Sequence, residues 1–295
     1  MGAHKINTDD LIRKLDEIPA LPGIIHELNR IINDPMSSAI EVEDILSQDI
    51  GLTTKVLQLA NSAHYGIPGG VSSLDRAIST IGFGAINQMV LSSSIIKILY
   101  VSGPSAFDIN EFWKHSVAVA IAGEVIAKQV RYKNPAELFT IGLLHDIGKL
   151  ALYITDQETL LFILATAEKN KKTYYETEIQ LDLTPHTKLG QLLGKKWKLP
   201  AQIQTALLYH HEKDPLDRGE LGQDIQRLVD VVYLANLLVH ALKFGSSGYT
   251  CITGAPGDLL DRLVINSKSD LATLTVKIKA SLDKASDFIQ MVSQP

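Results

Sequence analysis

Apolar residues recur every three or four positions along most of the chain, which is the spacing that places them on one face of an α-helix. The first clear series runs over residues 21–32 and consists of Leu21, Ile24, Ile25, Leu28, Ile31 and Ile32. Asn33-Asp34-Pro35 ends this series, because proline disfavours helical backbone at the residue before it. Few segments show the strict alternation that a half-buried strand needs. The pattern therefore predicts an all-α fold.

Further helices are predicted up to residue 99. A second apolar series, Val42, Ile45 and Leu46, follows Ser37-Ser38. A third begins at Asp49 and ends near Gly66, a residue type that commonly terminates helices. Ser72-Ser73 has the character of a helix N-cap. Gly82-Phe83-Gly84 separates the helix that starts there from an apolar stretch over residues 86–99. That stretch is too short to cross a bilayer, for which about 20 residues are needed.

Gly103-Pro104-Ser105 is the clearest internal break, and it divides the chain into two helical parts. We expect an N-terminal helical part over residues 1–102, a second helical bundle over 103–245 and a helical C-terminal extension over 246–295. In the second bundle the apolar spacing predicts helices at 107–130, 135–153, 157–170, 186–196, 200–211 and 224–243. The extension begins with a loop rich in Gly, Ser and Pro, and two final helices follow it.

The composition is that of a globular protein, with 45% apolar and 21% charged residues in 295 positions. The single cysteine, Cys251, excludes an internal disulfide framework and a cysteine-rich zinc site. The net charge of −5 disfavours a broad phosphate-binding surface, so we expect no nucleic-acid partner. Accordingly, the basic run Lys195-Lys196-Trp197-Lys198 is interpreted as a solvated helix face. Because no signal peptide and no apolar run of about 18 residues is recognised, we expect a cytoplasmic protein without a membrane partner.

The strongest chemical signal is a histidine beside an aspartate, His145-Asp146, within the apolar segment 142–150. Burying both groups costs free energy unless they are paired or bound to a metal. Neutral imidazole and ionised carboxylate are suitable ligands for Fe, Mn, Zn or Ni, and an aspartate can bridge two ions. The alternative interpretation is a buried, hydrogen-bonded pair that binds nothing.

Other histidines fall in the same half of the chain. Glu111 and His115 are four residues apart, so a helix places both on one surface. His186 begins a predicted helix, and His210-His211 lies at the end of another. Each of these alone is more often a capping or core residue, but their coincidence with His145-Asp146 favours a metal-binding cluster.

The order of these residues is similar to that of the HD superfamily of metal-dependent phosphohydrolases, in particular the HD-GYP branch that hydrolyses cyclic di-GMP. The N-terminal half resembles the HDOD domain, an all-helical bacterial signalling module. This second likeness rests on four phrases, Ile18-Pro19-Ala20-Leu21-Pro22, Ile45-Leu46-Ser47-Gln48-Asp49, Leu59-Ala60-Asn61-Ser62-Ala63 and Ala77-Ile78-Ser79-Thr80-Ile81-Gly82. The resemblance covers about residues 15–245 and implies a multi-helical HD-like bundle with an N-terminal helical subdomain.

The resemblance also implies roles for the matched residues. The implied metal ligands are His115, His145, Asp146, His186, His210 and His211, with Glu111 as a further ligand. Lys149 would contact a substrate phosphate and, with Asp146, take part in catalysis. The last aspartate of the superfamily corresponds to Asn236, whose uncharged oxygen should hold a divalent ion more weakly, and Asp230 is an alternative donor on the same predicted helix. The Gly-Tyr-Pro segment of the cyclic di-GMP enzymes is absent, which leaves the substrate open.

Two functions are therefore expected. The first is a bacterial signal-transduction protein in which one or two divalent ions, Fe, Mn, Zn or Ni, activate water for phosphodiester hydrolysis. Its partners would be signalling proteins and a phosphorylated small molecule or nucleotide. The second is a catalytically inactive regulatory or protein-interaction module with a metal-binding or vestigial site. The retained histidines favour the first function, and Asn236 favours the second.

Overall fold

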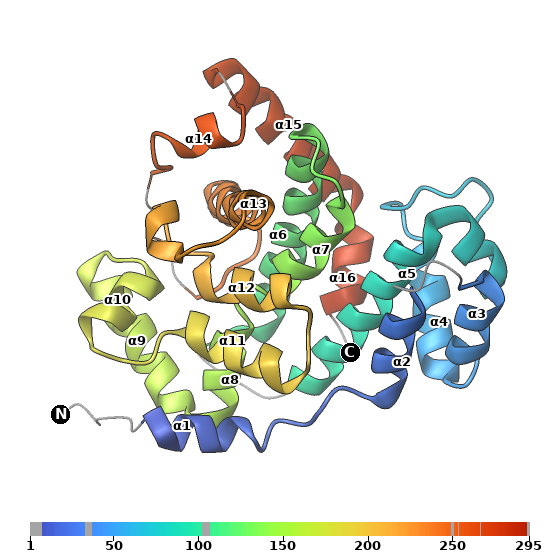
Figure 1. Ribbon diagram of the computed structural model, residues 1–295, viewed down its shortest axis with the longest axis horizontal. Coiled ribbons are helices and arrows are strands. Elements are labelled where there is room, and N and C mark those ends of the chain that lie inside the picture. Colours follow the sequence, from blue (N-terminus) through green and yellow to red (C-terminus); the bar gives the residue numbers. More distant parts are fainter. Residues whose placement is uncertain are drawn as a thin grey trace.

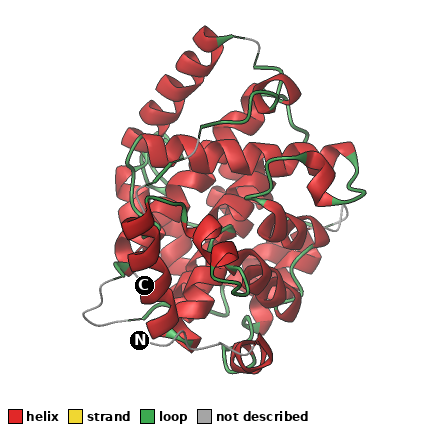
Figure 2. Cartoon of the chain, turned by 90° about the vertical axis from the view of Figure 1, so that its left-hand side faces the viewer, coloured by secondary structure: helices red, strands yellow, loops and turns green. Residues whose placement is uncertain are grey.

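The computed structural model describes residues 8–32, 37–101, 107–248, 251–252, 254–265 and 267–293. The described residues form helices and loops and contain no strand, as the hydrophobic spacing predicts (Figure 1 and Figure 2). The N-terminal helices are α1 (Thr8–Leu15), α2 (Gly23–Ile32), α3 (Ala39–Leu46), α4 (Ile50–Ala60) and α5 (Leu74–Leu99).

Helices α2 to α5 pack together into a small bundle at the right of Figure 1. Polar side chains fix where its helices begin, because Ser38, Asp49 and Ser73 each accept a hydrogen bond from a backbone N–H in the first turn. Helix α5 departs from helical geometry at Gly82 (φ 83°, ψ 163°), where the sequence predicts a break. Beyond this point the Gln88 side chain donates to a carbonyl at the start of α7 (Pro135–Leu144), so α5 links the small bundle to the rest of the molecule.

The second part surrounds α6 (Ile109–Gln129), which contacts α7 and several later helices. The later elements of this part are α8 (Ile147–Thr155), α9 (Gln157–Asn170), α10 (Tyr174–Gln180), α11 (His186–Lys196), α12 (Ala201–Tyr209), the 3-10 turn η1 (Pro215–Arg218) and α13 (Gln223–Ala241), of which α13 contacts α6. Every residue of α6 from His115 to Gly123 is buried. Side chains on this part of α6 are therefore shielded from water by the helices around them.

The sequence predicts one helix over 135–153, but the structure has two, α7 and α8, which are separated by His145-Asp146. Glycines on either side of the break allow close contact between backbones. A Cβ on Gly142 would lie 2.7 Å from the Cα of Ala120 in α6, and one on Gly148 would lie 1.8 Å from the carbonyl oxygen of His186. The break therefore brings the start of α8 directly against the start of α11.

Two side chains at the end of α11 hold the segment that follows α1. The Lys196 ammonium donates hydrogen bonds of 2.8, 2.7 and 2.6 Å to the carbonyl oxygens of Leu15, Asp16 and Ile18. The buried Trp197 indole donates to the carbonyl oxygen of Pro19 at 2.9 Å. The interpretation of this basic run as a solvated face is therefore wrong for Lys196 and Trp197, since they satisfy carbonyls at and beyond the end of α1. As a result, α1 lies against α8 and α11.

The C-terminal extension contains α14 (Leu259–Arg262), α15 (Lys268–Lys284) and α16 (Ser286–Ser293), one short helix more than the sequence predicts. Helices α15 and α16 lie along α6, and α16 ends between the two parts of the molecule (Figure 1). The ring of Phe288 in α16 lies 4.9 Å from that of His64, 5.8 Å from Tyr65 and 6.0 Å from Phe139. The extension therefore joins the N-terminal bundle to α7.

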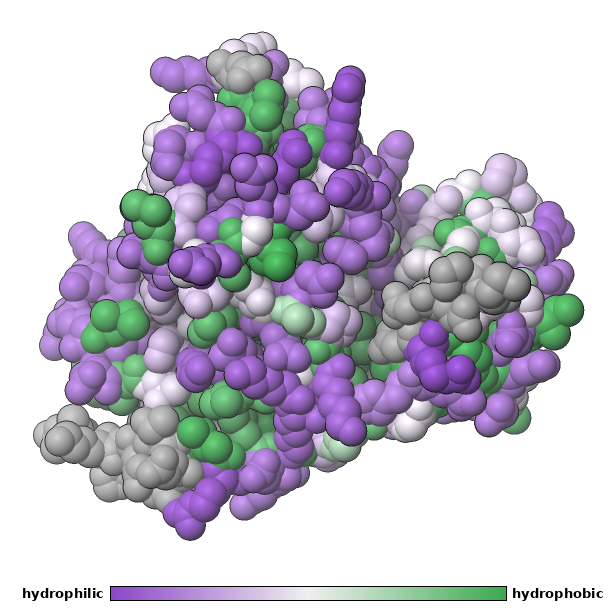
Figure 3. Space-filling model, viewed as in Figure 1, coloured by the Kyte–Doolittle hydropathy of each residue, from purple (hydrophilic) through white to green (hydrophobic). Residues whose placement is uncertain are grey.

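Two stretches, Leu74–Leu99 and Pro135–Thr155, are long and apolar enough to cross a membrane by length and composition, which corrects the expectation that no such run exists. In the fold, 44% and 89% of their most apolar windows are buried. The first is interrupted at Gly82 and the second at His145-Asp146. Polar side chains cover most of the face shown in Figure 3, and apolar ones form small separate groups there.

The contact between α8 and α11 predicts that Gly148→Ala is strongly destabilising. The added methyl group would overlap the carbonyl oxygen of His186, so the two helix ends must separate. We expect the free energy of unfolding to fall by about 3 kcal/mol or more, the upper range for overpacking. Urea unfolding followed by circular dichroism measures this. Gly222→Ala is the matched control, because an added Cβ there meets nothing within 4 Å; equal effects of the two substitutions would contradict the packing described.

Candidate metal centre

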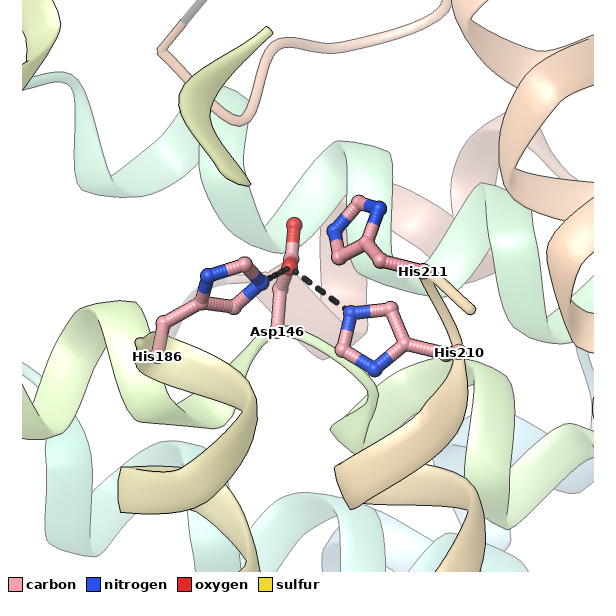
Figure 4. Close-up of side chains that lie close together, drawn as sticks. All are labelled: Asp146, His186, His210 and His211. Carbon is pink, nitrogen blue, oxygen red and sulfur yellow. Dashed lines mark ion pairs between the residues drawn. The ribbon is translucent and has the colours of Figure 1, made fainter. Parts of the chain in front are cut away.

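Side chains from three separate places in the chain converge at the break between α7 and α8, and all of them are buried except His211, which is partly buried (Figure 4). Asp146 lies in the break, His186 is the first residue of α11, and His210 and His211 follow the end of α12. The Asp146 Oδ1 lies 3.1 Å from His186 Nε2 and 3.5 Å from His210 Nε2. One donor atom from each of the four side chains lies within 4.8 Å of the others.

The rings are oriented by hydrogen bonds on their other nitrogen. His210 Nδ1 donates to the carbonyl oxygen of Leu207 at 3.0 Å, and His145 Nδ1 donates to that of Gly142 at 2.7 Å. Because a carbonyl can only accept, Nδ1 of each ring carries a proton, and any further proton would have to bind at Nε2. This arrangement, with the outer nitrogen held by the protein, is the usual one for metal-binding histidines.

Glu178 orients His186 in the same way. Its Oε2 lies 2.6 Å from His186 Nδ1, and its Oε1 accepts the His186 backbone N–H at 2.7 Å. Both side chains are fully buried. Burial alone would lower the pKa of His186, but the charge of Glu178 together with the hydrogen bonds to Asp146 and Glu178 outweighs burial, and the pKa is raised. A metal ion at His186 therefore competes with a proton.

The donor atoms of this cluster have the properties that a metal ion requires. Among the described residues, the buried atoms without a hydrogen-bond partner include Asp146 Oδ1 and the Nε2 atoms of His145, His186, His210 and His211. Leaving so many buried polar atoms unsatisfied is costly, and a cation between them would satisfy several at once. Imidazole nitrogen and carboxylate oxygen together suit Fe, Mn, Zn or Ni. The residues therefore fit a divalent metal ion.

Electrostatics keep most of these donors in the metal-binding protonation state. Burial by itself would raise the pKa of Asp146, but the attraction of His145 and Lys149 outweighs burial and holds that pKa well below its usual value. Burial lowers the pKa of His210 to about 4 and that of His211 well below the usual value for histidine. At neutral pH the aspartate is thus ionised and these two imidazoles are uncharged.

Lys149 lies at the cluster, where its ammonium faces Asp146. Its fully buried ammonium donates to Asp146 Oδ2 at 2.7 Å and to the Ser247 hydroxyl at 3.3 Å. The same nitrogen lies 4.9 Å from the centre of the Tyr174 ring. Lys149 therefore forms an ion pair with Asp146, and its contact with a substrate phosphate stays a prediction.

A second set of donors, His115, His145 and Asp146, lies on the other side of the aspartate. His115 Nε2 lies 3.0 Å from the Asn236 side-chain oxygen. These two predicted metal ligands are therefore hydrogen-bonded to each other. Sequence reasoning missed His240, whose ring centre lies 4.3 Å from that of His115 and whose Nε2 lies 3.4 Å from the Ser247 hydroxyl. Its spacing of four residues from Asn236 on one helix was the available signal. Glu178 and Ser247 were also missed, and neither lies in a recognisable motif.

Two candidate ligands lie away from the cluster. The Glu111 carboxylate pairs with Lys114 at 3.2 Å and is 42% exposed, and it is not one of the grouped donors. As predicted, Glu111 lies on the same helix as His115. It is nevertheless partly exposed, because neighbouring helices cover only part of the first turns of α6. Asp230 is held by Arg218 at 2.8 Å and by Arg262 at 2.7 Å. Neither Glu111 nor Asp230 is therefore placed to bind a metal here.

A cleft of about 290 Å³ opens beside the cluster. His210, His211, Asn236 and His240 all line it, so a metal ion bound there would be within reach of a ligand in the cleft. The charged residues that line the cleft are mostly acidic, namely Glu176, Glu212, Asp214 and Asp217 against Lys213. The cleft therefore offers access to the metal site but little positive charge of its own.

The chain belongs to the HDOD family, because the model of the HDOD domain matches residues 18–213, well over half of the sequence. This confirms the resemblance that the N-terminal phrases suggest. A relative from Treponema pallidum (strain Nichols), named "Uncharacterized protein", is 24% identical over 272 residues, which are 92% of this chain and 50% of the relative. The chain thus spans half the length of that relative.

Solved structures share the fold. An HDOD domain protein with unknown function from Geobacter sulfurreducens is 25% identical, with a TM-score of 0.75 and coverage of 94% of this chain and 98% of that one. A protein from Marinobacter aquaeolei VT8 named "Putative signal transduction protein" is 17% identical, with a TM-score of 0.78 and coverage of 97% and 65%. A protein from Shewanella amazonensis SB2B named "Putative metal-dependent phosphohydrolase" is 21% identical, with a TM-score of 0.59 and coverage of 92% and 96%. The all-helical HDOD fold predicted from the sequence is therefore confirmed.

The buried histidines predict that the metal-free protein loses stability in acid. An unfolded histidine titrates near pH 6.5, whereas burial lowers the pKa of His210 to about 4 and that of His240 to about 3. As the pH falls from 6.5 to 4, the unfolded chain takes up protons that the folded chain does not, so the free energy of unfolding falls. His240→Gln removes one such group and should make this dependence shallower by about 1.4 kcal/mol per pH unit.

Urea unfolding in the presence of a chelator, repeated at several pH values, measures this dependence. His26→Gln is the control, because His26 is exposed on α2. An identical pH dependence in His240→Gln and the parent protein would show that His240 titrates normally in the folded state.

Proposed function

We propose that the protein is a signalling phosphohydrolase of the HDOD family, with a divalent metal ion held by Asp146, His186, His210 and His211. The observation that carries the proposal is the convergence of four buried donor atoms, none with a hydrogen-bond partner, beside an open cleft. The proposed substrate is a phosphoester small enough for a cleft of about 290 Å³, and the metal is Fe, Mn, Zn or Ni. The name of the Shewanella amazonensis structure agrees with this proposal.

Asp146, His186, His210 and His211 would hold a divalent ion, which would supply activated water and polarise a phosphoryl oxygen. The protein residues prepare the site for that chemistry. Glu178 fixes the ring of His186, and the Leu207 carbonyl fixes that of His210. Lys149 holds the Asp146 carboxylate in its ionised form and in one orientation. Because these contacts are buried, the donors are already in place before a ligand enters, which reduces the cost of binding.

The second candidate is a regulatory module that binds a metal or ligand without turnover. The acidic lining of the cleft and the engagement of Lys149 with Asp146 favour it, since no described lysine or arginine other than Lys213 lines the cleft. The packing of Phe288 against His64, Tyr65 and Phe139 would connect such a site to the N-terminal bundle, where a signalling protein could bind. The name of the Marinobacter aquaeolei structure agrees with a signalling role.

Metal content measured by plasma mass spectrometry tests the proposal. The purified protein should carry near-stoichiometric metal, and His210→Gln should lose at least tenfold in metal affinity because glutamine cannot replace the Nε2 lone pair. His64→Gln is the matched control, since His64 packs on Phe288 away from the cluster. A protein that takes up no metal even after reconstitution would overturn the proposal.

The two candidate functions are separated by turnover. Hydrolysis of phosphate mono- and diesters by the metal-loaded protein, lost in His210→Gln and retained in His64→Gln, is expected from the phosphohydrolase. Stoichiometric metal without hydrolysis of any ester in the screen would leave the regulatory module as the better description.

A further inference from the structure

The two carboxylate oxygens of Asp146 have different environments. Oδ1 has no hydrogen-bond partner and lies among the Nε2 atoms of His186 and His210. Oδ2 lies 2.7 Å from the Lys149 ammonium and 3.3 Å from His145 Nε2. An aspartate that bridges two metal ions with one ion on each oxygen needs both oxygens for cations. Here one of the two already has a cation of the protein itself.

The Lys149 ammonium is held firmly in this position. Its second contact, the buried Ser247 hydroxyl at 3.3 Å, belongs to the segment that follows α13. This segment is locked onto α6, because Ser246 donates its N–H to the Glu111 carbonyl at 3.0 Å and Gly245 (φ +69°) lies against the backbone of His115, where a Cβ would be 2.3 Å from the nitrogen. Moving the ammonium away from Oδ2 would therefore require breaking buried contacts.

The remaining donors on this side are also poorly suited to a second ion. The Asn236 side-chain oxygen accepts a hydrogen bond from His115 Nε2, so that nitrogen carries a proton and only the buried Nδ1 of His115 keeps a lone pair. Asn236 itself brings no negative charge. A second divalent ion would thus meet a fixed positive charge a few ångströms away with one shared carboxylate to balance it, in an interior where such repulsion is poorly screened.

From this geometry we propose that the centre binds one divalent ion, on the Oδ1 side of Asp146, and that the Lys149 ammonium takes the place of a second metal. The inference rests on the metal site of the proposed function and specifies its stoichiometry. It assigns to Lys149 a role within the cluster, as the residue that excludes a second ion, and it leaves His145 and His115 without a metal ion of their own.

Equilibrium dialysis of the metal-free protein against Mn²⁺, followed by plasma mass spectrometry, measures the number of bound ions without any activity assay. The parent protein should bind one ion per chain. Asn236→Asp restores a carboxylate but keeps the ammonium, so it should still bind one. The double variant Lys149→Met/Asn236→Asp removes the charge and supplies a ligand, and it should bind two.

Lys114→Met is a further control, because Lys114 also pairs with a carboxylate, but on the surface, and its loss should leave one ion per chain. Circular dichroism melting checks that each variant is folded, and Lys149→Gln/Asn236→Asp serves as a second double variant that keeps a hydrogen-bonding group at position 149.

The outcomes distinguish this inference from the proposed function. Two ions in the parent protein would overturn the single-ion assignment while leaving the metal site intact. One ion in both folded double variants would show that Lys149 does not exclude a second ion. No bound ion in the parent protein would overturn this inference together with the metal site on which it rests.

Discussion

The burial of the Asp146 carboxylate is the constraint on which the rest of the site depends. A fully buried negative charge is expensive unless it is compensated by nearby positive charge or by hydrogen bonds. Here Lys149 compensates one oxygen at 2.7 Å, and the other faces His186 and His210. The unsatisfied Oδ1 is what makes a cation favourable at this point, and the satisfied Oδ2 is what makes the two sides of the carboxylate unequal.

The fold delivers the donors to this carboxylate through close backbone contacts. Gly142 lets α7 approach α6, and Gly148 lets the start of α8 touch the start of α11, where His186 lies. Gly245 likewise allows the segment after α13 to pack against His115, and Ser247 then reaches Lys149. Because backbone atoms at these contacts leave no room for a side chain, the donor positions are set by helix packing rather than by flexible loops. Such preorganisation suits a site that binds a metal or performs chemistry.

The chain belongs to the HDOD family, and its candidate metal centre is connected to an N-terminal helical bundle through packed helices. The C-terminal extension strengthens this link, because Phe288 contacts rings in both parts. The same helix lies along α6, which carries His115. A change at the cluster and a change at the N-terminal bundle would therefore act on a shared set of packed helices.

Local sequence features determined the helices, their caps and the residue types of the site. Periodic apolar positions and N-cap residues act within a few neighbours, so the helical fold, the break at Gly82 and the grouping of His145-Asp146 with His186 and His210-His211 could be read from the chain. Only the tertiary structure decided which way each side chain faces and what it meets. In the fold, Glu111 lies near the surface and Lys149 forms an ion pair with Asp146. His240 packs on His115, Glu178 contacts His186, and Lys196 donates hydrogen bonds at the end of α1. Some of these contacts join residues that are far apart in the sequence. Others depend on which part of a helix is covered by neighbouring helices. The local spacing of residues encodes neither property.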